Sequence, residues 1–134
     1  VLMFQKEVAE RIIAESNTTK YGRLSILSRW KLNVEKIIDI KPQSFSPRPK
    51  IDSTLLLFTP RENFFELKDA KNLEMLTRIF FSQRRKMLKR PFNKVFNNAK
   101  EVAEKFDINL NLRPQNLEPE MYFNLVKEYE NLRR

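Results

Sequence analysis

The chain has 134 residues, 41% of them hydrophobic and 32% charged, so it can bury a core and is not expected to be wholly disordered. It contains no cysteine and no histidine, which excludes disulfides, thiolate metal sites, imidazole catalysis and the usual zinc sites. The net charge of +9 favours a polyanionic partner, with nucleic acid ahead of an anionic membrane surface. With no signal peptide and no apolar run of membrane-spanning length, we expect a reducing, cytoplasmic setting and no bound metal.

The N-terminal part of the chain is expected to hold the end of a strand and two helices. Residues 1–4 predict the end of a buried strand. Residues 5–15 predict a helix, because apolar side chains recur there at a spacing of four. Residues 21–31 predict a second helix with Leu24, Leu27 and Trp30 on its inner face. Gly22, the only glycine, is expected to relieve a backbone or packing conflict near the start of that helix.

Two strands are expected next, at about 33–40 and 51–58, because both runs are apolar and partly β-branched. The connection between them contains Pro47 and a second proline two residues later, each of which fixes its own φ and restricts the residue before it. Residues 45–50 are therefore predicted to form a stiff, extended bridge. Such a bridge could hold one aromatic ring, that of Phe45, at the edge of the sheet.

A domain junction is predicted at residues 61–69, where β-branched runs give way to helical periodicity. It separates a first domain, residues 1–60, from a helical domain, residues 70–134. Within the second domain we expect shorter helices at 92–96 and 99–106, a turn at 113–116, and a last helix that begins at Pro119.

Residues 72–90 give the clearest helical pattern, with an apolar face and an opposite basic face. Pro91 is expected to stop or kink this helix. From Arg78 to Lys94 there are seven basic residues and no acidic one, which argues against an ordinary solvated face. The predicted inner face holds Leu73, Leu76, Phe80 and Met87, and the outer face holds Arg78, Arg85 and Lys89.

A cationic helix face of this kind suits the phosphate backbone of RNA, where charged contacts position the strand without reading its sequence. The alternative is a solvated charged face with no partner. The candidate RNA-binding residues are Arg78, Arg84, Arg85, Lys86, Lys89, Arg90 and Lys94, with Arg48, Lys50 and Arg23 extending the track.

Four segments, in order and with the right spacing, resemble motifs of one enzyme family. Residues 4–11 are similar to Leu-Gln-Lys-Glu-Val-Ala-x-Arg, and residues 21–25 match Tyr-Gly-Arg-Leu-Ser. Residues 45–53 resemble Phe-x-Pro-x-Pro-Lys-Val-Asp-Ser, and residues 81–86 resemble Phe-x-Gln-Arg-Arg-Lys. The family is that of the ribosomal RNA adenine dimethyltransferases, the KsgA (RsmA) and Dim-type enzymes, with the Erm resistance methyltransferases as more distant relatives.

The resemblance implies a fold of the mixed α/β and all-α kind. It consists of the C-terminal strands and helices of a Rossmann-like class I methyltransferase sheet, followed by a small helical domain. It also implies an activity for the full-length enzyme: transfer of methyl groups from S-adenosylmethionine, without metal, to two adjacent adenines near the 3′ end of small-subunit (16S) ribosomal RNA. The implied partner is the small ribosomal subunit, bound by a monomer. Phe45, supported by Pro47, would stack on the target adenine; the alternative is that Phe45 plugs the end of the sheet.

The motifs by which this family binds its methyl donor and its target nitrogen are missing from the sequence. One glycine cannot build a glycine-rich loop, and no asparagine stands in an Asn-Leu-Pro-aromatic context. We therefore expect the C-terminal portion of the enzyme, with no catalytic or cofactor-binding residue and no activity on its own. Residues 89–92 depart from the family pattern, which leaves the length of the basic helix open. The alternatives are a non-enzymatic RNA- or DNA-binding helical module of the same fold family and, more weakly, an amphipathic membrane-surface domain.

Overall fold

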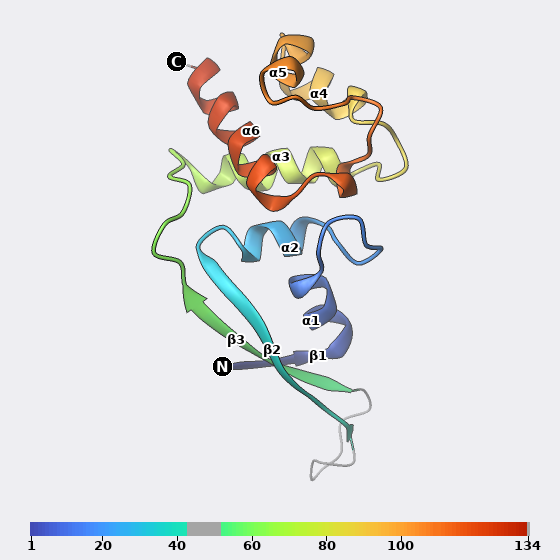
Figure 1. Ribbon diagram of the computed structural model, residues 1–134, viewed down its shortest axis with the longest axis vertical. Helices are drawn as coiled ribbons and strands as arrows, with labels where there is room; N and C mark the ends of the chain where they lie inside the picture. The colour runs from blue at the N-terminus through green and yellow to red at the C-terminus, as the bar shows by residue number, and fades with distance from the viewer. Residues whose placement is uncertain (43–51, 134) are drawn as a thin grey trace.

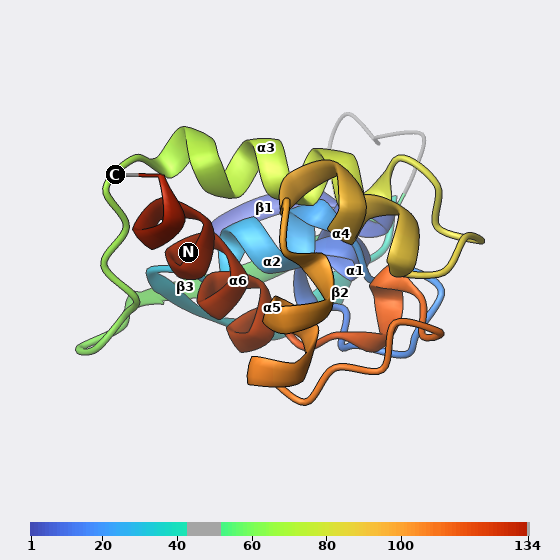
Figure 2. The same ribbon diagram turned by 90° about the horizontal axis from the view of Figure 1, so that it is seen from above.

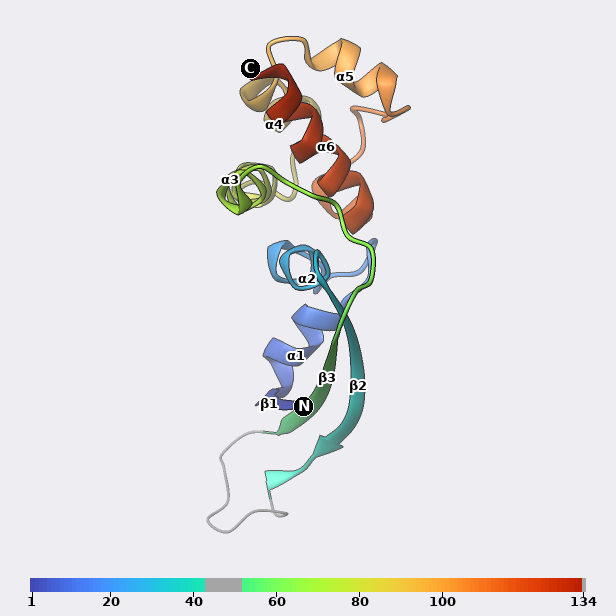
Figure 3. The same ribbon diagram turned by 90° about the vertical axis from the view of Figure 1, so that its left-hand side faces the viewer.

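The structure, a computed structural model, describes residues 1–42 and 52–133. A small sheet with helix α1 lies at one end of an elongated molecule and helices α3 to α6 lie at the other, with helix α2 between them (Figures 1 and 3). Seen from above, α6 runs obliquely away from one end of α3, and α4 and α5 lie toward the other end of α3 (Figure 2). Within the described ranges, no helix is both long enough and apolar enough to cross a membrane.

The sheet has three antiparallel strands in the order β1-β3-β2, with bounds β1 (Leu2–Gln5), β2 (Leu32–Ile40) and β3 (Ser53–Pro60). The two strands predicted around the proline bridge are thus confirmed, and a bulge between Lys36 and Ile38 interrupts their pairing. The prediction that the first strand is buried is wrong, because Leu2 and Met3 are more than half exposed. The reason is that, among the described residues, β1 pairs only with β3 and forms an edge of the sheet.

Helix α1 (Lys6–Ile13) packs on the sheet through Ala9 and Ile12, which are buried together with Leu56 of β3. The predicted helix at 5–15 is therefore present but shorter. Its last carbonyl groups are not left unpaired, because the guanidinium of Arg29 donates to the carbonyl oxygens of Ile13 and Ala14, the latter over 2.7 Å.

Helix α2 (Arg23–Ser28) is also shorter than the predicted 21–31, and its inner face differs from the prediction. Leu24 is exposed, contrary to the prediction, whereas Leu27 and Trp30 pack against the core as predicted. Tyr21 and Ile26 are fully buried against the helices that follow. Gly22 has a φ of −173°, which any residue adopts, and a Cβ there would lie an ordinary 3.5 Å from the guanidinium of Arg84. The predicted conflict at Gly22 is therefore not present in the described structure.

The helical body, which we define as residues 70–132, contains α3 (Ala70–Phe81), α4 (Lys89–Val95), α5 (Ala99–Lys105), the 3-10 turn η2 (Pro114–Asn116) and α6 (Pro119–Leu132). The predicted helix at 99–106, the turn and the helix start at Pro119 are confirmed, whereas the helix predicted at 92–96 begins earlier, at Lys89. Its core also contains Tyr21 and Ile26. The division into domains at residues 61–69 stays a prediction, and the core shows that α2 packs with the helices beyond that point.

The single basic helix predicted at 72–90 is wrong. Helix α3 ends at Phe81, residues 82–88 form a turn, and α4 begins at Lys89. We call residues 82–88 the basic loop. The break brings Leu88 into the core with no exposed area and leaves Met87, the predicted inner residue, 43% exposed.

Pro91 lies in the first turn of α4, where the missing N–H has no intrahelical acceptor to lose, so it starts a helix instead of ending one. The basic loop is fixed by backbone bonds to a distant segment instead of by helical ones. The amide of Leu88 donates to the carbonyl of Leu112 over 2.8 Å, and that of Lys89 donates to the carbonyl of Leu110 over 3.2 Å.

The start of α3 is held by a buried carboxylate from α6. Glu130 is 5% exposed and accepts hydrogen bonds from the amides of Lys68 and Asp69 and from the side-chain amide of Asn72. Asp69 adds a cap by accepting from the amide of Lys71 over 2.9 Å. These contacts fix the two longest helices of the body to each other.

Candidate nucleic-acid interface

Four of the residues predicted from sequence to meet RNA lie outside the described residues. These are Phe45, Pro47, Arg48 and Lys50, which fall in the undescribed range 43–51. The stacking role of Phe45, its alternative as a plug of the sheet end, and the stiff bridge at 45–50 therefore stay predictions.

The cations of the basic loop and of the start of α4 surround one groove of about 560 Å³. Four of its seven lining residues belong to the predicted RNA-binding set, and all four are exposed. None of the four ion pairs found among the described residues involves any of them. The groove is lined by Arg85, Lys86, Met87, Lys89, Arg90, Asn93 and Arg113.

Uncompensated guanidinium and ammonium groups around a groove suit phosphate oxygens, because each contact releases counterions and forms a charge-assisted hydrogen bond. Arg90 also donates to the side-chain oxygen of Gln83 over 3.2 Å, which links α4 to the basic loop. The groove therefore offers several cations at fixed positions without an opposing carboxylate in its lining.

Arg113 is the one groove cation that sequence reasoning missed. Its Nε donates to the carbonyl of Arg85 over 3.1 Å and its Nη1 donates to the carbonyl of Asn111 over 3.2 Å. A lone arginine in a turn 28 residues from Arg85 carries no sequence signal of its own. Its role in fixing the backbone of Arg85 becomes visible only in the folded chain, where residues 110–113 lie against the basic loop.

Arg84 points to a second, smaller hollow of about 340 Å³, where the motifs at 21–25 and 81–86 meet. Its guanidinium lies 5.7 Å from the centre of the Phe81 ring, within range of a cation–π contact. Arg23 lines the same hollow but is partly engaged, since it donates to the hydroxyl of Thr77 and to the carbonyl of Glu74. Arg23 thus ties α2 to α3, so only part of its charge is available to a ligand.

The remaining predicted cations do not join either hollow. Arg78 is exposed on α3 and Lys94 is exposed on α4, and neither lines the groove or the smaller hollow. Because the predicted helix breaks at residue 82, the seven cations from Arg78 to Lys94 do not share one helix face. The structure brings together Arg85, Lys86, Lys89 and Arg90, with Arg84 beside them.

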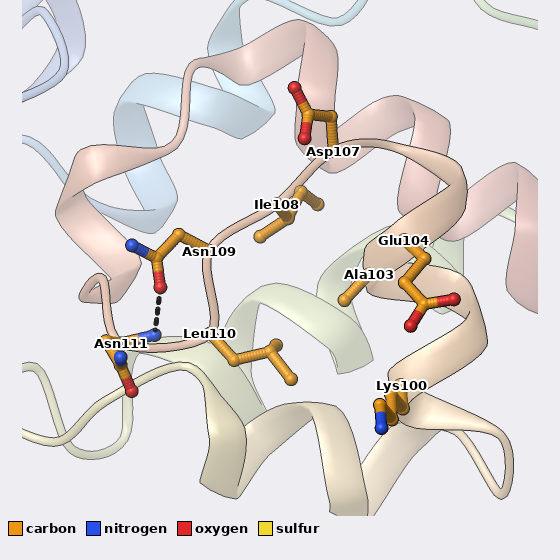
Figure 4. Close-up of a pocket in the computed structure, with 8 residues that line it drawn as sticks. All are labelled: Lys100, Ala103, Glu104, Asp107, Ile108, Asn109, Leu110 and Asn111. Atoms are coloured by element: carbon orange, nitrogen blue, oxygen red, sulfur yellow. Dashed lines mark hydrogen bonds between the residues drawn. The ribbon is translucent and has the colours of Figure 1, made fainter.

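A third hollow, of about 310 Å³, differs from the groove because both acidic and basic side chains line it (Figure 4). It lies between α5 and the segment after it, and its lining includes Lys100 but also the carboxylates of Glu104 and Asp107. The amide of Asn111 donates to the side-chain oxygen of Asn109 over 2.9 Å, which closes a local turn. With two carboxylates and one ammonium, this hollow is not suited to a phosphate strand.

The buried tyrosines are structural. Burial raises the pKa of Tyr21 and that of Tyr122, so both hydroxyls keep their protons. Tyr21 donates to the carbonyl of Leu117 over 2.6 Å and Tyr122 donates to the carbonyl of Pro114 over 2.5 Å. They hold the segment around η2 in place. Among residues 1–42 and 52–133, no group of three or more acidic side chains could hold a metal ion.

Comparison with known proteins gives a consistent answer. A family model described as ribosomal RNA adenine dimethylase matches residues 1–131. Over 133 residues the chain is 81% identical to ribosomal RNA small subunit methyltransferase A of Pelagibacter ubique, covering 99% of the chain and 51% of that protein. It is 43% identical to the protein of the same name from a Wolbachia strain of Drosophila simulans, covering 98% of the chain and 48% of the relative.

Solved structures agree with these matches. A dimethyladenosine transferase from Plasmodium falciparum superposes with a TM-score of 0.82 at 30% identity, covering 97% of this chain and 57% of that one. The 23S rRNA methyltransferase ErmE superposes with a TM-score of 0.62 at 17% identity, covering 96% and 53%, which shows similarity of fold. The chain spans about half the length of the curated relatives it matches.

Proposed function

Because the chain belongs to the ribosomal RNA adenine dimethylase family, we propose that it supplies RNA contacts to an S-adenosylmethionine-dependent enzyme that methylates small-subunit ribosomal RNA. The finer proposal is that the whole enzyme converts two adjacent adenines near the 3′ end of that RNA to N6,N6-dimethyladenine. The names of the relatives, which include a small-subunit methyltransferase and a dimethyladenosine transferase, support it.

The observation that carries the proposal is the groove between the basic loop and α4. Its cations have no carboxylate partner among the described residues, and their backbone is held by bonds to residues 110–113. Phosphate contacts of this kind supply affinity and fix register but read no sequence. We propose that the groove positions the RNA while selection of the adenine takes place elsewhere.

Phe45 is proposed to take part in that selection. An adenine drawn out of its RNA context loses its stacking partners, and an aromatic face restores roughly 1–3 kcal/mol of that loss. Phe45→Ala in the complete enzyme should then reduce methylation far more than it reduces stability. Undiminished methylation of small-subunit RNA by that variant would contradict the stacking role.

The described residues do not fit the methyl donor. The only glycine, Gly22, has extended backbone and lies beside Arg84, so no glycine-rich turn is available to approach a cofactor. We therefore propose that donor binding and methyl transfer depend on residues beyond this chain, and that the chain alone is inactive.

The proposed role of the groove is tested by reversing two of its charges, with Arg85→Glu and Lys89→Glu, in the full-length enzyme that contains this chain. Each removed contact should weaken binding to small-subunit ribosomal RNA roughly tenfold. The slope of log affinity against log salt should fall by about 0.7–0.9 per contact. Binding is measured by filter retention or fluorescence anisotropy over a range of salt concentrations.

Lys100→Glu is the matched control, because Lys100 is an exposed helical lysine in the mixed-charge hollow of Figure 4. It carries the same change of charge outside the groove and should alter affinity little. Equal losses for Lys100→Glu and Lys89→Glu, or an affinity independent of salt, would show that the groove is not the RNA site.

The alternative of a non-enzymatic RNA- or DNA-binding module makes use of the same groove. It differs in one result, since such a protein would bind but would not transfer methyl groups to adenine. Incubation of the intact protein with S-adenosylmethionine and small-subunit RNA, followed by nucleoside analysis, separates the two.

A further inference from the structure

A pocket of about 470 Å³, separate from the groove and the two hollows described above, lies at the other end of α3 from the basic loop. In Figure 1 the segment between β3 and α3, which lines it, runs down the left of the molecule, whereas the basic loop lies on the right. The 12 residues of α3 separate the two by roughly 18 Å at 1.5 Å per residue. The pocket is lined by Arg61, Asn63, Phe64, Phe65, Glu66 and Lys127. We call it the Phe64 pocket.

The aromatic wall of the Phe64 pocket is held in place but is not part of a core. Phe64 is 40% exposed, and its ring lies 6.4 Å from that of Trp30 at 89°. Trp30 is itself fixed, because its Nε1 donates to the carbonyl of Phe65 over 2.6 Å. The rings are therefore pre-positioned, and a large apolar surface on Phe64 stays open to solvent.

One cation that is not part of the pocket lining lies against these rings, and another cation lines the pocket. The ammonium of Lys31 lies 4.6 Å from the centre of the Trp30 ring and 5.0 Å from that of Phe64. Neither Lys31 nor Lys127 takes part in any ion pair found among the described residues. An ammonium over an aromatic face keeps N–H donors for an anion, and Lys127 supplies a second cation at the pocket wall.

The backbone beneath the rings is braced. The guanidinium of Arg61 donates to the carbonyl of Arg29 over 2.8 Å, and the amide of Arg61 donates to the carbonyl of Lys31 over 2.9 Å. Arg61 therefore joins the end of β3 to the turn that carries Trp30 and Lys31. The pocket keeps its shape without a ligand, which reduces the entropy lost on binding.

We propose that the Phe64 pocket receives one unpaired base of an RNA strand, stacked on Phe64, with the neighbouring phosphate on Lys31 and Lys127. An exposed ring beside ammonium groups that have no carboxylate partner is an arrangement that binds single strands, because every base has a face to stack and a phosphate to pair. Glu66 at the wall disfavours a purely electrostatic contact, so the base contributes most of the recognition. The proposal rests on the RNA binding proposed above and adds a second contact point to it.

Trp30 provides the measurement, because it is the only tryptophan of the 134 residues and lies against Phe64. The intact protein is titrated with a single-stranded RNA octamer while tryptophan emission is recorded. The same titration of a Trp30→Phe variant is subtracted, so that the remaining signal comes from Trp30. We expect saturable quenching by the single strand and none by a duplex of equal length, whose bases are paired.

Phe64→Leu should weaken octamer binding roughly 5- to 150-fold. Phe106→Leu is the matched control, since Phe106 also lies near a lysine, 5.6 Å from the ammonium of Lys105, but outside the pocket. Lys31→Ala should lower the salt dependence of the quenching. Circular dichroism checks that each variant is folded.

The outcomes separate this inference from the proposed function. If RNA binds in a manner that depends on Arg85 while Trp30 gives no signal, the pocket inference is wrong and the groove stands. Equal affinity for adenosine monophosphate and for the octamer would overturn the assignment to a strand. A Trp30 response that appears only with ribosomal proteins, and not with RNA stripped of them, would overturn it as well. Absence of any RNA binding would refute the proposed function itself.

Discussion

The helical body and the sheet region bury their apolar side chains to very different extents. The core of the body, with Tyr21 and Ile26, contains sixteen buried hydrophobic residues, whereas α1 and the sheet share three: Ala9, Ile12 and Leu56. The sheet region instead exposes Leu2 and Met3 on β1 and Ile37 and Ile38 on β2. Because burial of apolar surface is the main stabilising contribution, the stability of the described chain resides in the helical body.

The contrast extends to function. The basic loop is mounted on the stable region, which can hold its cations at fixed positions. Residues 43–51, with the proposed adenine-stacking Phe45, are connected in sequence to β2 and β3 of the sheet region. Three predictions test this contrast, from the largest expected effect to the smallest.

Phe80→Ala should lower the free energy of unfolding by about 3–5 kcal/mol. Phe80 is 1% exposed, and its ring centre lies 5.5 Å from that of Phe92 and 5.6 Å from that of Tyr122, so truncation leaves a cavity that cannot close. Leu56→Ala in the sheet core should cost less, about 2 kcal/mol, because few buried neighbours surround it. Both are measured by urea denaturation. Equal losses of unfolding free energy in the two variants would contradict the proposed difference in stability between the helical body and the sheet region.

Glu130→Gln should cost about 1–3 kcal/mol at neutral pH, because an amide cannot accept all three hydrogen bonds that the carboxylate receives. Burial raises the pKa of Glu130, but the hydrogen bonds from Asn72 and from the amides of Lys68 and Asp69 lower it more, so the net pKa lies below its usual value. A carboxyl with a lowered pKa in the folded state stabilises above its unfolded pKa and loses that contribution as the pH falls.

The difference between the protein and Glu130→Gln should therefore be largest at neutral pH and shrink as the pH drops below the usual glutamate range. Denaturation curves at several pH values measure it. Glu104→Gln is the control, since Glu104 is exposed on α5 and its change should stay within about 0.5 kcal/mol. A difference that does not vary with pH would show that the carboxylate charge is not what fixes α3 to α6.

The smallest effect concerns the sheet. The hydroxyl of Thr54 donates to Asp39 over 2.8 Å and the ammonium of Lys36 lies 3.1 Å away, and in that order they lower the pKa of Asp39. Thr54→Val should move this pKa back toward its ordinary value, as followed by an NMR titration. Thr59→Val, at an exposed position of the same strand, should leave it unchanged. An unchanged pKa of Asp39 in the Thr54→Val variant would mean that the hydrogen bond between Thr54 of β3 and Asp39 of β2 does not set this pKa.

Sequence periodicity predicted the element types well and one boundary badly. The pattern at 72–90 is helical by every local criterion, but Leu88 rather than Met87 enters the core, because it meets a segment more than twenty residues away. Helical periodicity depends only on residues that are close in the sequence. It therefore cannot predict that a helix ends where its backbone forms hydrogen bonds with a distant segment. The same limit explains why the first strand was wrongly predicted to be buried, since its burial depends on which elements pack beside it.

The functional residues divide in the same way. The cations at 84–86 and 89–90 were identifiable from charge and motif. Arg113, and the closeness of Trp30 to Phe64 across 34 positions, arise only when the chain folds. Motif resemblance identified the family, but no local pattern separates a cation that meets a groove from one, such as Arg78, that does not.

The paired backbone at Leu88–Leu112 and Lys89–Leu110 means that residues 89–110 leave the basic loop and return to the same place. Helices α4 and α5 thus form an excursion closed at its base. A residue inserted or deleted at the exposed turn around Asn97 would change the far end of the excursion and leave Arg85 where it is. Evolution can therefore vary the length of this excursion while the groove of the basic loop keeps its spacing.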